Sequence, residues 1–177
     1  DAYLQASLYA YKLEPSADAA VGCAAMAFKK GDIDGSVKFF DEAINLETDN
    51  AKKADNAYKA ASVLASAKKL SQARSYAQKA ISFNENFGAP YILIAQLYAG
   101  NYKWNDEPAL NKCTFFAAID KLQRAKAVDP SVAEEANKLI SSYSAYTPEA
   151  KDLFMLGYKA GDRITIGGWI GETTTIR

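Results

Sequence analysis

The stretch ADAAVGCAAMAFKKGDIDGSVKFFDEAINL, residues 17–46, carries the pattern that decides the fold. One face of its first half is lined by small side chains, those of Ala20, Cys23, Ala24 and Ala27. Gly31-Asp32 interrupts the pattern, and a second run returns through Ser36 and Phe40 to Ala43. Spacings of three and four residues stack side chains on one face of a helix. Because small residues let helix axes approach closely, the stretch predicts two antiparallel helices joined near Gly31.

The end of this stretch recurs along the chain as a small residue, an apolar pair and a turn. The endings are Ala10 to Leu13 before Pro15, Ala43 to Leu46 before Thr48 and Ala125 to Val128 before Pro130, with Ala80 to Phe83 before Glu85 as a looser fourth. They lie roughly 33 to 37 residues apart where the chain is uninterrupted, a period typical of paired-helix repeats. A second alanine-lined helix follows at Ala57, Ala60, Ala61 and Leu64, and a third unit begins at Gly88-Ala89-Pro90. The sequence therefore predicts an internal repeat.

The small-residue, aromatic and Gly-Asp turn positions of these units resemble those of the tetratricopeptide repeat, a helix–turn–helix unit of about 34 residues. The resemblance implies an all-α solenoid of antiparallel helix pairs, with about three units plus half-units. Two features depart from the family pattern. Ala20, Ala57 and Tyr91 stand where tryptophan often opens the first helix, and of the unit endings only Pro15 and Pro130 keep the closing proline. The alternative is a non-repetitive helical bundle.

The repeat also sets the expected boundaries. Residues 1–160 are expected to form the helical repeat domain, with an insertion at 100–109 in the third unit and helix resuming around Leu110. Asp1 falls within the second helix of a unit whose first helix is missing. The sequence therefore predicts that the chain is a piece of something longer.

Residues 161–177 change character. Arg163-Ile164-Thr165-Ile166 alternates, and Thr173 to Ile176 is rich in β-branched side chains, which favour extended backbone. We expect a short two-stranded ribbon that turns near Gly171-Glu172. Two interpretations remain open: the apolar side chains of the ribbon cover the last helix pair, or its free edge accepts a strand from another protein. The side chains expected to cover the helices are Ile164, Ile166, Trp169 and Ile170.

The C-terminal part of the chain, from the insertion onward, is similar to that of a group of exported tetratricopeptide-repeat proteins of Gram-negative bacteria. This resemblance implies a bacterial protein of the periplasm or cell envelope. Composition alone does not indicate a compartment.

The charge balance excludes one class of partner. Lysine plus arginine and aspartate plus glutamate each number 21, so the net charge is zero and no field attracts a phosphate backbone. We expect no nucleic-acid partner. No apolar run approaches the ~20 residues that span a bilayer, so we expect no membrane insertion.

The residue types present also argue against catalysis and metal binding. Histidine is absent from all 177 residues, which removes the usual general base and the commonest zinc ligand. No glycine-rich phosphate loop and no calcium-loop pattern occurs. Cys23 and Cys113 are expected to be too far apart for a disulfide, because packed helices lie ~8–10 Å apart. The sequence predicts no catalytic residues, no metal site, no cofactor and no enzyme.

A partner is expected in the groove formed by the first helices of successive units, at positions one step off the packing face. These positions are Val21 and Ala25 in the first unit, Asp55, Tyr58, Lys59 and Ser62 in the second, and Ile92, Gln96 and Ala99 in the third. The surface is mildly apolar, which favours an extended or helical peptide. One subset of the family grips the C-terminal carboxylate of chaperones through Lys and Asn at groove positions. Such places hold Val21, Ala25, Tyr58, Ser62 and Lys59 here, so we expect no carboxylate clamp.

Two aromatic residues allow two interpretations each. Tyr58 either anchors a bound peptide or packs on a neighbouring unit. Trp104, in the insertion, belongs either to a recognition loop or to a plug folded over the third unit.

The leading hypothesis is a non-enzymatic scaffold that binds a protein or peptide. The alternative is a carrier or sensor domain for a small molecule or glycan, with an aromatic platform made by Tyr58, Tyr91, Tyr98 and Trp104. A third hypothesis is an accessory domain attached to an enzyme encoded upstream.

Overall fold

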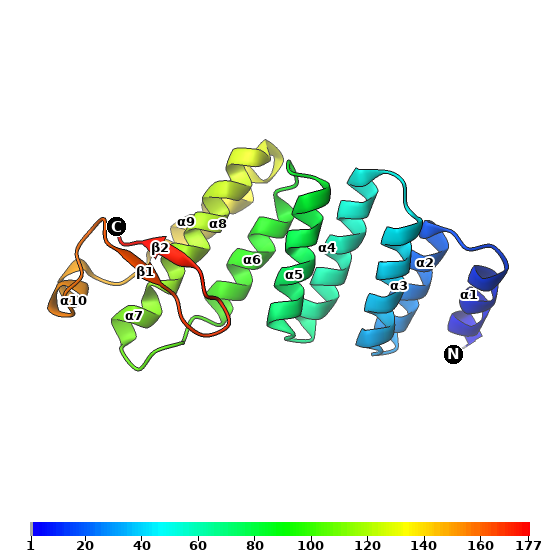
Figure 1. The fold of residues 1–177 in the computed structure, drawn as a ribbon, viewed down its shortest axis with the longest axis horizontal. Helices are drawn as coiled ribbons and strands as arrows, with labels where there is room; N and C mark the ends of the chain where they lie inside the picture. The colour runs from blue at the N-terminus through cyan, green and yellow to red at the C-terminus, as the bar shows by residue number, and fades with distance from the viewer. Residues whose placement is uncertain (1) are drawn as a thin grey trace. The chain divides into compact units, whose positions relative to one another are not determined.

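A computed structural model describes residues 2–177, which form two compact units, one ending at Phe87 and the other running from Gly88 to Arg177. Helices packed in adjacent antiparallel pairs account for most of the chain, and a two-stranded sheet lies near the C-terminus (Figure 1). The expected all-α architecture with a short C-terminal ribbon is therefore confirmed.

The first unit consists of helical hairpins. Its helices are α1 (Ala2–Leu13), α2 (Ala17–Lys29), α3 (Ile33–Leu46), α4 (Asn50–Ser66) and α5 (Leu70–Phe83). Helices α2 and α3 form one hairpin, α4 and α5 form the next, and α3 packs against α4. The lone helix α1 packs on α2.

Local sequence explains where these helices begin. Ser16 accepts a hydrogen bond from the Ala19 amide at 3.1 Å and so caps α2. Asp32 caps α3 by accepting from the Gly35 amide at 2.9 Å. The turn between them places Gly31 at φ 89°, a left-handed conformation that glycine adopts without strain.

Alanine lines the contact between the helices of each hairpin. On α2, Ala20, Cys23 and Ala24 are fully buried, and the Ser36 hydroxyl of α3 donates to the Ala24 carbonyl at 2.8 Å. The next hairpin repeats the design with fully buried Ala57, Ala60, Ala61, Ala73, Ala77 and Ala80. Small side chains thus bring the backbones close enough for a side chain of one helix to bond the backbone of the other.

Equivalent positions of the two hairpins also contact each other. Lys69 Nζ lies 3.5 Å from a carboxylate oxygen of Asp34, and the Tyr76 hydroxyl donates to Asp41 at 2.8 Å. The partners are 35 residues apart in both pairs, which is one repeat. Two bridges therefore join the same face of the two hairpins.

The second unit contains α6 (Ala89–Gly100), α7 (Pro108–Lys112), α8 (Thr114–Val128), the 3-10 turn η1 (Pro130–Val132), α9 (Ala133–Ser144) and α10 (Ala150–Met155). Helix α8 packs on α6 and on α9. The insertion separates α6 from α7, and helix resumes in two pieces rather than one continuous helix.

The start of α9 differs from the sequence pattern. Ser131 and Glu134 have the spacing of a reciprocal capping box, but α9 has no side-chain cap, and Asp129 caps the preceding 3-10 turn η1 instead. Its carboxylate accepts from the Ser131 amide at 3.1 Å, from the Ser131 hydroxyl at 2.6 Å and from the Gly88 amide at 2.9 Å. Asp129 therefore joins the start of α6 to the end of α8, a long-range role that the local pattern does not reveal.

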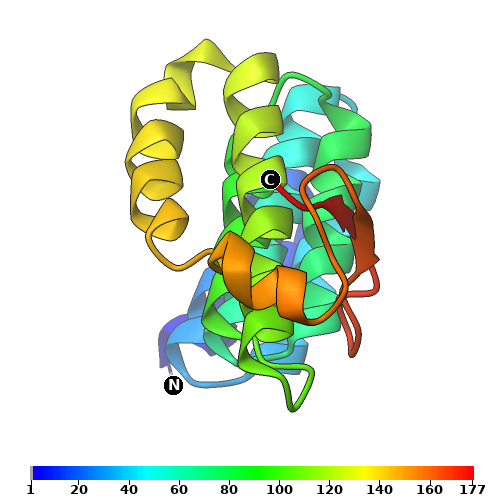
Figure 2. The ribbon, with the colours of Figure 1, turned by 90° about the vertical axis from the view of Figure 1, so that its left-hand side faces the viewer.

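The C-terminal ribbon pairs β1 (Arg163–Thr165) with β2 (Thr173–Thr175) in antiparallel register, Ile164 opposite Thr174. The connection between the strands covers residues 166–172, a longer turn than the one expected near Gly171-Glu172. Strand β2 packs on α8, as Figure 2 shows. The buried apolar side chains of this segment are Ile164, Ile166, Ile170 and Ile176, and Thr174 is buried as well.

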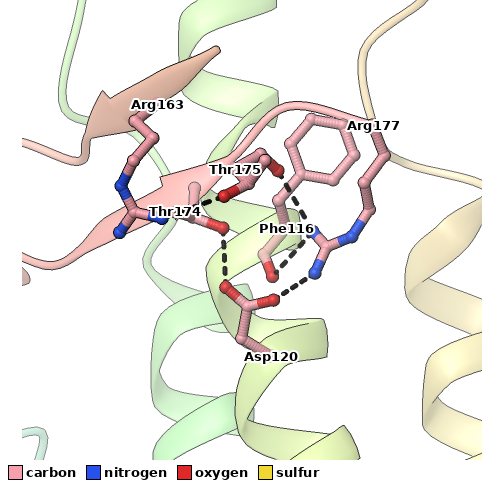
Figure 3. Close-up of polar contacts among 6 residues, drawn as sticks. All are labelled: Phe116, Asp120, Arg163, Thr174, Thr175 and Arg177. Atoms are coloured by element: carbon pink, nitrogen blue, oxygen red, sulfur yellow. Dashed lines mark hydrogen bonds and ion pairs between the residues drawn. The ribbon is translucent and has the colours of Figure 1, made fainter. Parts of the chain in front are cut away.

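Polar contacts fix the ribbon to α8 (Figure 3). The Thr174 hydroxyl donates to Asp120 at 2.6 Å, and the Arg177 guanidinium forms an ion pair with the same carboxylate. Lys121 Nζ lies 2.6 Å from Glu172 Oε1. One turn of α8 thus carries two charged groups that face the ribbon.

Candidate functional site

An aromatic pocket of about 470 Å³ opens on the second unit. Four of its lining residues are aromatic and come from four segments: Tyr102 from the insertion, Phe115 from α8, Tyr143 from α9 and Tyr146 from the turn after α9. The others are Gln96, Ala99, Gly100 and Lys112. We refer to this site as the aromatic pocket.

Phe115 is the centre of the aromatic pocket. The rings of Tyr102, Tyr143 and Tyr146 lie 5.1, 5.9 and 5.5 Å from its ring centroid. Phe115 itself is 6% exposed, whereas Tyr146 is 57% exposed. A buried ring therefore supports three tyrosines, and aromatic pairs of this geometry stabilise one another beyond the area they bury.

The insertion is held in a defined conformation that positions Tyr102. The buried Asn111 side chain accepts from the amides of Trp104 and Asn105 at 2.8 and 2.7 Å, and donates to the Asn105 carbonyl at 2.7 Å. The Thr114 hydroxyl donates to the Tyr102 carbonyl at 2.8 Å. These bonds replace the backbone pairing that an irregular segment lacks.

Trp104 does not enter the aromatic pocket. Its indole lies against the C-terminal segment, where a Cβ at Gly167 would approach Trp104 Cε3 to 2.7 Å. Nearby, Trp169 packs edge-on against Tyr98 of α6, with centroids 5.5 Å apart. Of the two interpretations, this placement favours the plug, which packs on the connection between β1 and β2.

Two lysines lie at the aromatic pocket. Lys112 is its only charged lining residue, and Lys103 Nζ lies 6.0 Å from the Tyr102 ring centroid. Burial raises the pKa of Tyr143 above its ordinary value, so this phenol stays neutral at physiological pH. Burial also raises the pKa of the nearby Cys113 thiol to about 11, which keeps the thiol protonated and a poor nucleophile.

The groove residues predicted in the third repeat, which belongs to the compact unit from Gly88 to Arg177, have different surroundings. Gln96 and Ala99 line the aromatic pocket. Ile92 is only 4% exposed and has almost no surface to offer a ligand, so its expected position in the groove is wrong. It lies on the buried side of α6, a helix that is apolar on nearly every face, and the repeat spacing did not separate its inner positions from its outer ones.

The groove residues predicted in the first and second repeats lie on α2 and α4, in the compact unit that ends at Phe87. Ala25, Asp55 and Lys59 are exposed, and Val21, Tyr58 and Ser62 are half-buried. Val21 packs against a cluster of Ala24, Phe40, Ala60 and Val63. The Tyr58 ring packs edge-on against Phe87 at 5.4 Å, and the Ser62 hydroxyl donates to the Tyr58 carbonyl at 3.0 Å. Tyr58 therefore packs within its own unit while keeping part of its surface in solvent.

The aromatic platform expected for a small-molecule carrier does not form as predicted. Tyr98 is fully buried, Trp104 packs on Gly167, and Tyr58 packs on Phe87. Tyr91 is half-buried. The aromatic side chains that do gather around an opening are those of the aromatic pocket. The spacing of Tyr143 and Tyr146, three residues apart at a helix end, was the available sequence signal.

Neither a metal site nor a membrane-spanning helix is found among residues 2–177. Within that range no three histidine, cysteine or acidic side chains come together as metal ligands would. None of the helices described is long and apolar enough to cross a membrane. Cys23 and Cys113 are both buried free thiols, as expected.

Comparisons with known proteins give the same fold. No protein-family model matches the sequence, and no curated protein matches it. Among solved structures, a crystal structure of MamA aligns with a TM-score of 0.56 at 20% identity, covering 74% of this chain and 64% of MamA. The TPR2B domain of yeast Sti1, in complex with pHsp70, aligns with a TM-score of 0.56 at 23% identity over 73% of this chain and 96% of that domain. YrrB, described as a TPR protein with an unusual peptide-binding site, aligns with a TM-score of 0.54 at 21% identity over 87% of this chain and 73% of YrrB.

Proposed function

The chain has the tetratricopeptide-repeat fold, and we propose that it is a non-enzymatic module that binds a peptide or protein partner. In this proposal the aromatic pocket receives a large apolar side chain of the partner. Gln96 and the three tyrosine hydroxyls supply hydrogen bonds around that side chain. The exposed parts of α2 and α4 in the first unit, with Val21, Ala25, Asp55, Tyr58, Lys59 and Ser62, form a further contact face.

The observation that carries the proposal is the aromatic pocket itself. Its volume of about 470 Å³ lies within the range typical of ligand sites, and its lining is mostly apolar with a few polar groups. Tyrosine is enriched where proteins bind one another, because its ring gives a large contact area and its hydroxyl gives a hydrogen bond. The Sti1 and YrrB structures support the proposal by analogy, since one is a complex with pHsp70 and the other has a peptide-binding site.

Selection from a random peptide library tests the proposal. We expect enriched peptides that share a large apolar residue, and we expect Tyr146→Ala to weaken their binding by at least about tenfold. Tyr9→Ala is the matched control, because Tyr9 is 67% exposed on α1 and lies in the other unit. Failure to enrich any peptide, or equal binding by both variants, would contradict the proposal.

A further inference from the structure

The short helix α10 exposes an unusual amount of apolar surface. Its Leu153 is 1% exposed and anchors the helix, whereas the next two side chains, Phe154 and Met155, are 76% and 85% exposed. Leu156 follows at 38%. Scattered exposed apolar residues are ordinary, but three consecutive ones are typical of interaction surfaces.

The surface around α10 is shaped as a ridge between two hollows. One hollow, of about 430 Å³, lies between α10 and the end of the ribbon, where Tyr158 and Ile176 line it. The other, of about 370 Å³, lies between α10 and α7, where Pro108 and Leu156 line it. Met155 lines both hollows and forms the ridge. Two adjacent depressions can receive two apolar side chains of one partner segment.

The charges of the larger hollow indicate what such a segment carries. Its charged lining residues are all cationic: Lys151, Lys159 and Arg177. Lys151 pairs with Glu149 at 3.2 Å and Arg177 pairs with Asp120, but neither carboxylate lines the hollow. Lys159 has no ion pair among residues 2–177. The smaller hollow differs, since Glu107 and Asp152 accompany Lys112 there.

We propose that the ridge and hollows around Met155 dock an acidic amphipathic helix of a partner protein. The apolar face of that helix covers Phe154 and Met155, and its carboxylates lie beside Lys151 and Lys159. Charge complementarity of this kind selects the partner and fixes its orientation, while the buried apolar side chains supply most of the affinity. The smaller hollow shares Lys112 with the aromatic pocket, but the larger hollow does not, and the proposal does not depend on the function proposed for that pocket.

The test uses two synthetic helical peptides as probes. One has Leu and Phe along one face and Glu at the remaining positions, and the other has Lys in place of every Glu. We expect the acidic peptide to bind and the basic peptide to bind at least about tenfold more weakly. We expect Met155→Glu to abolish binding of the acidic peptide and Lys159→Glu to reduce or reverse the preference. Both side chains are exposed, so circular dichroism should show an unchanged fold.

Tyr9→Ala should leave binding of the acidic peptide unchanged, because Tyr9 is exposed on α1 and lines neither hollow. Equal binding of both peptides, or no effect of Met155→Glu, would overturn the proposal. Sedimentation that shows a dimer dissociated by Met155→Glu would assign the surface to a second copy of the chain. Flotation with phosphatidylserine vesicles that is lost in Met155→Glu would assign it to a membrane, and either result would also overturn the proposal.

Discussion

The rings of Phe115 and Tyr146 are stacked, with their planes 27° apart and their centroids 5.5 Å apart. Phe115 is the second residue of α8, whereas Tyr146 lies in the turn after α9, so this pair ties the end of α9 to the start of α8. The buried member supports the aromatic pocket and the exposed member forms its rim.

The two members of this pair should therefore respond differently to truncation. Phe115→Ala removes a ring that is 6% exposed, and we expect it to lower the free energy of unfolding by about 3–5 kcal/mol. Tyr146→Ala, at a 57% exposed position, should lower it by less than about 1 kcal/mol. Urea titration followed by circular dichroism measures both. Equal losses would mean that the rim also supports the fold.

Gly167 should not tolerate a side chain. A Cβ there would lie 2.7 Å from Trp104 Cε3, so we expect Gly167→Ala to displace the indole and to change tryptophan fluorescence. Gly22→Ala is the control and should have the opposite effect on stability. Nothing lies within 4 Å of a Cβ at Gly22, inside α2, and alanine favours helix over glycine by about 0.5–1 kcal/mol. Thermal unfolding should therefore show destabilisation by the first change and stabilisation by the second.

Asp120 should control how firmly the ribbon is held. Asp120→Ala removes the acceptor of Thr174 and the partner of Arg177, and we expect faster amide hydrogen exchange in residues 163–175. Lys138→Ala is the matched control, because Lys138 forms an exposed ion pair with Glu134 at 3.5 Å on α9. Unchanged exchange in the Asp120 variant would show that the apolar contacts of the ribbon suffice.

Asp129 should give the second unit part of its acid sensitivity. Hydrogen bonds from the Ser131 side chain and then from the Gly88 amide hold the pKa of this carboxyl below its ordinary value. A carboxyl with a lowered pKa in the folded state stabilises the fold above the unfolded pKa, near 3.8, and this stabilisation disappears as the pH falls through the folded pKa.

The variant Asp129→Asn tests this linkage. The difference in free energy of unfolding between the parent chain and the variant should be largest near neutral pH and should shrink below about pH 4. Denaturant titrations across that range measure it. A difference that stays constant with pH would rule out Asp129 as the titrating group.

The alanine faces were predictable because their physics is local. Ala20 and Ala24 recur at helical spacing, and both are fully buried where α2 meets α3. The free thiols of Cys23 and Cys113 were predictable from the distance expected between packed helices. In α9, by contrast, the apolar positions Leu139 and Ile140 remain half-buried and Ala136 alone is fully buried, because the pattern indicates an apolar face but not how much of it a neighbour covers.

The aromatic pocket was not predictable in the same way. Its rings come from four segments, and the insertion that supplies Tyr102 has no periodicity to interpret. Its conformation depends on three short hydrogen bonds between the Asn111 side chain and the backbone. No sequence pattern indicates these bonds. Tertiary contacts that bring distant segments together, such as the bond from Gly88 to Asp129, lie outside what spacing can indicate.

The paired bridges from Asp34 to Lys69 and from Asp41 to Tyr76 have an evolutionary consequence. Asp34 and Asp41 of the first hairpin are the acceptors, whereas Lys69 and Tyr76 hold the equivalent positions of the second hairpin and are the donors. A tandem copy of residues 34–68, placed in frame, would set Asp34 of one copy opposite Asp34 of the next, and two carboxylates repel each other. Gene duplication alone would therefore not extend these contacts, because the added copy would also have to acquire donors at both positions.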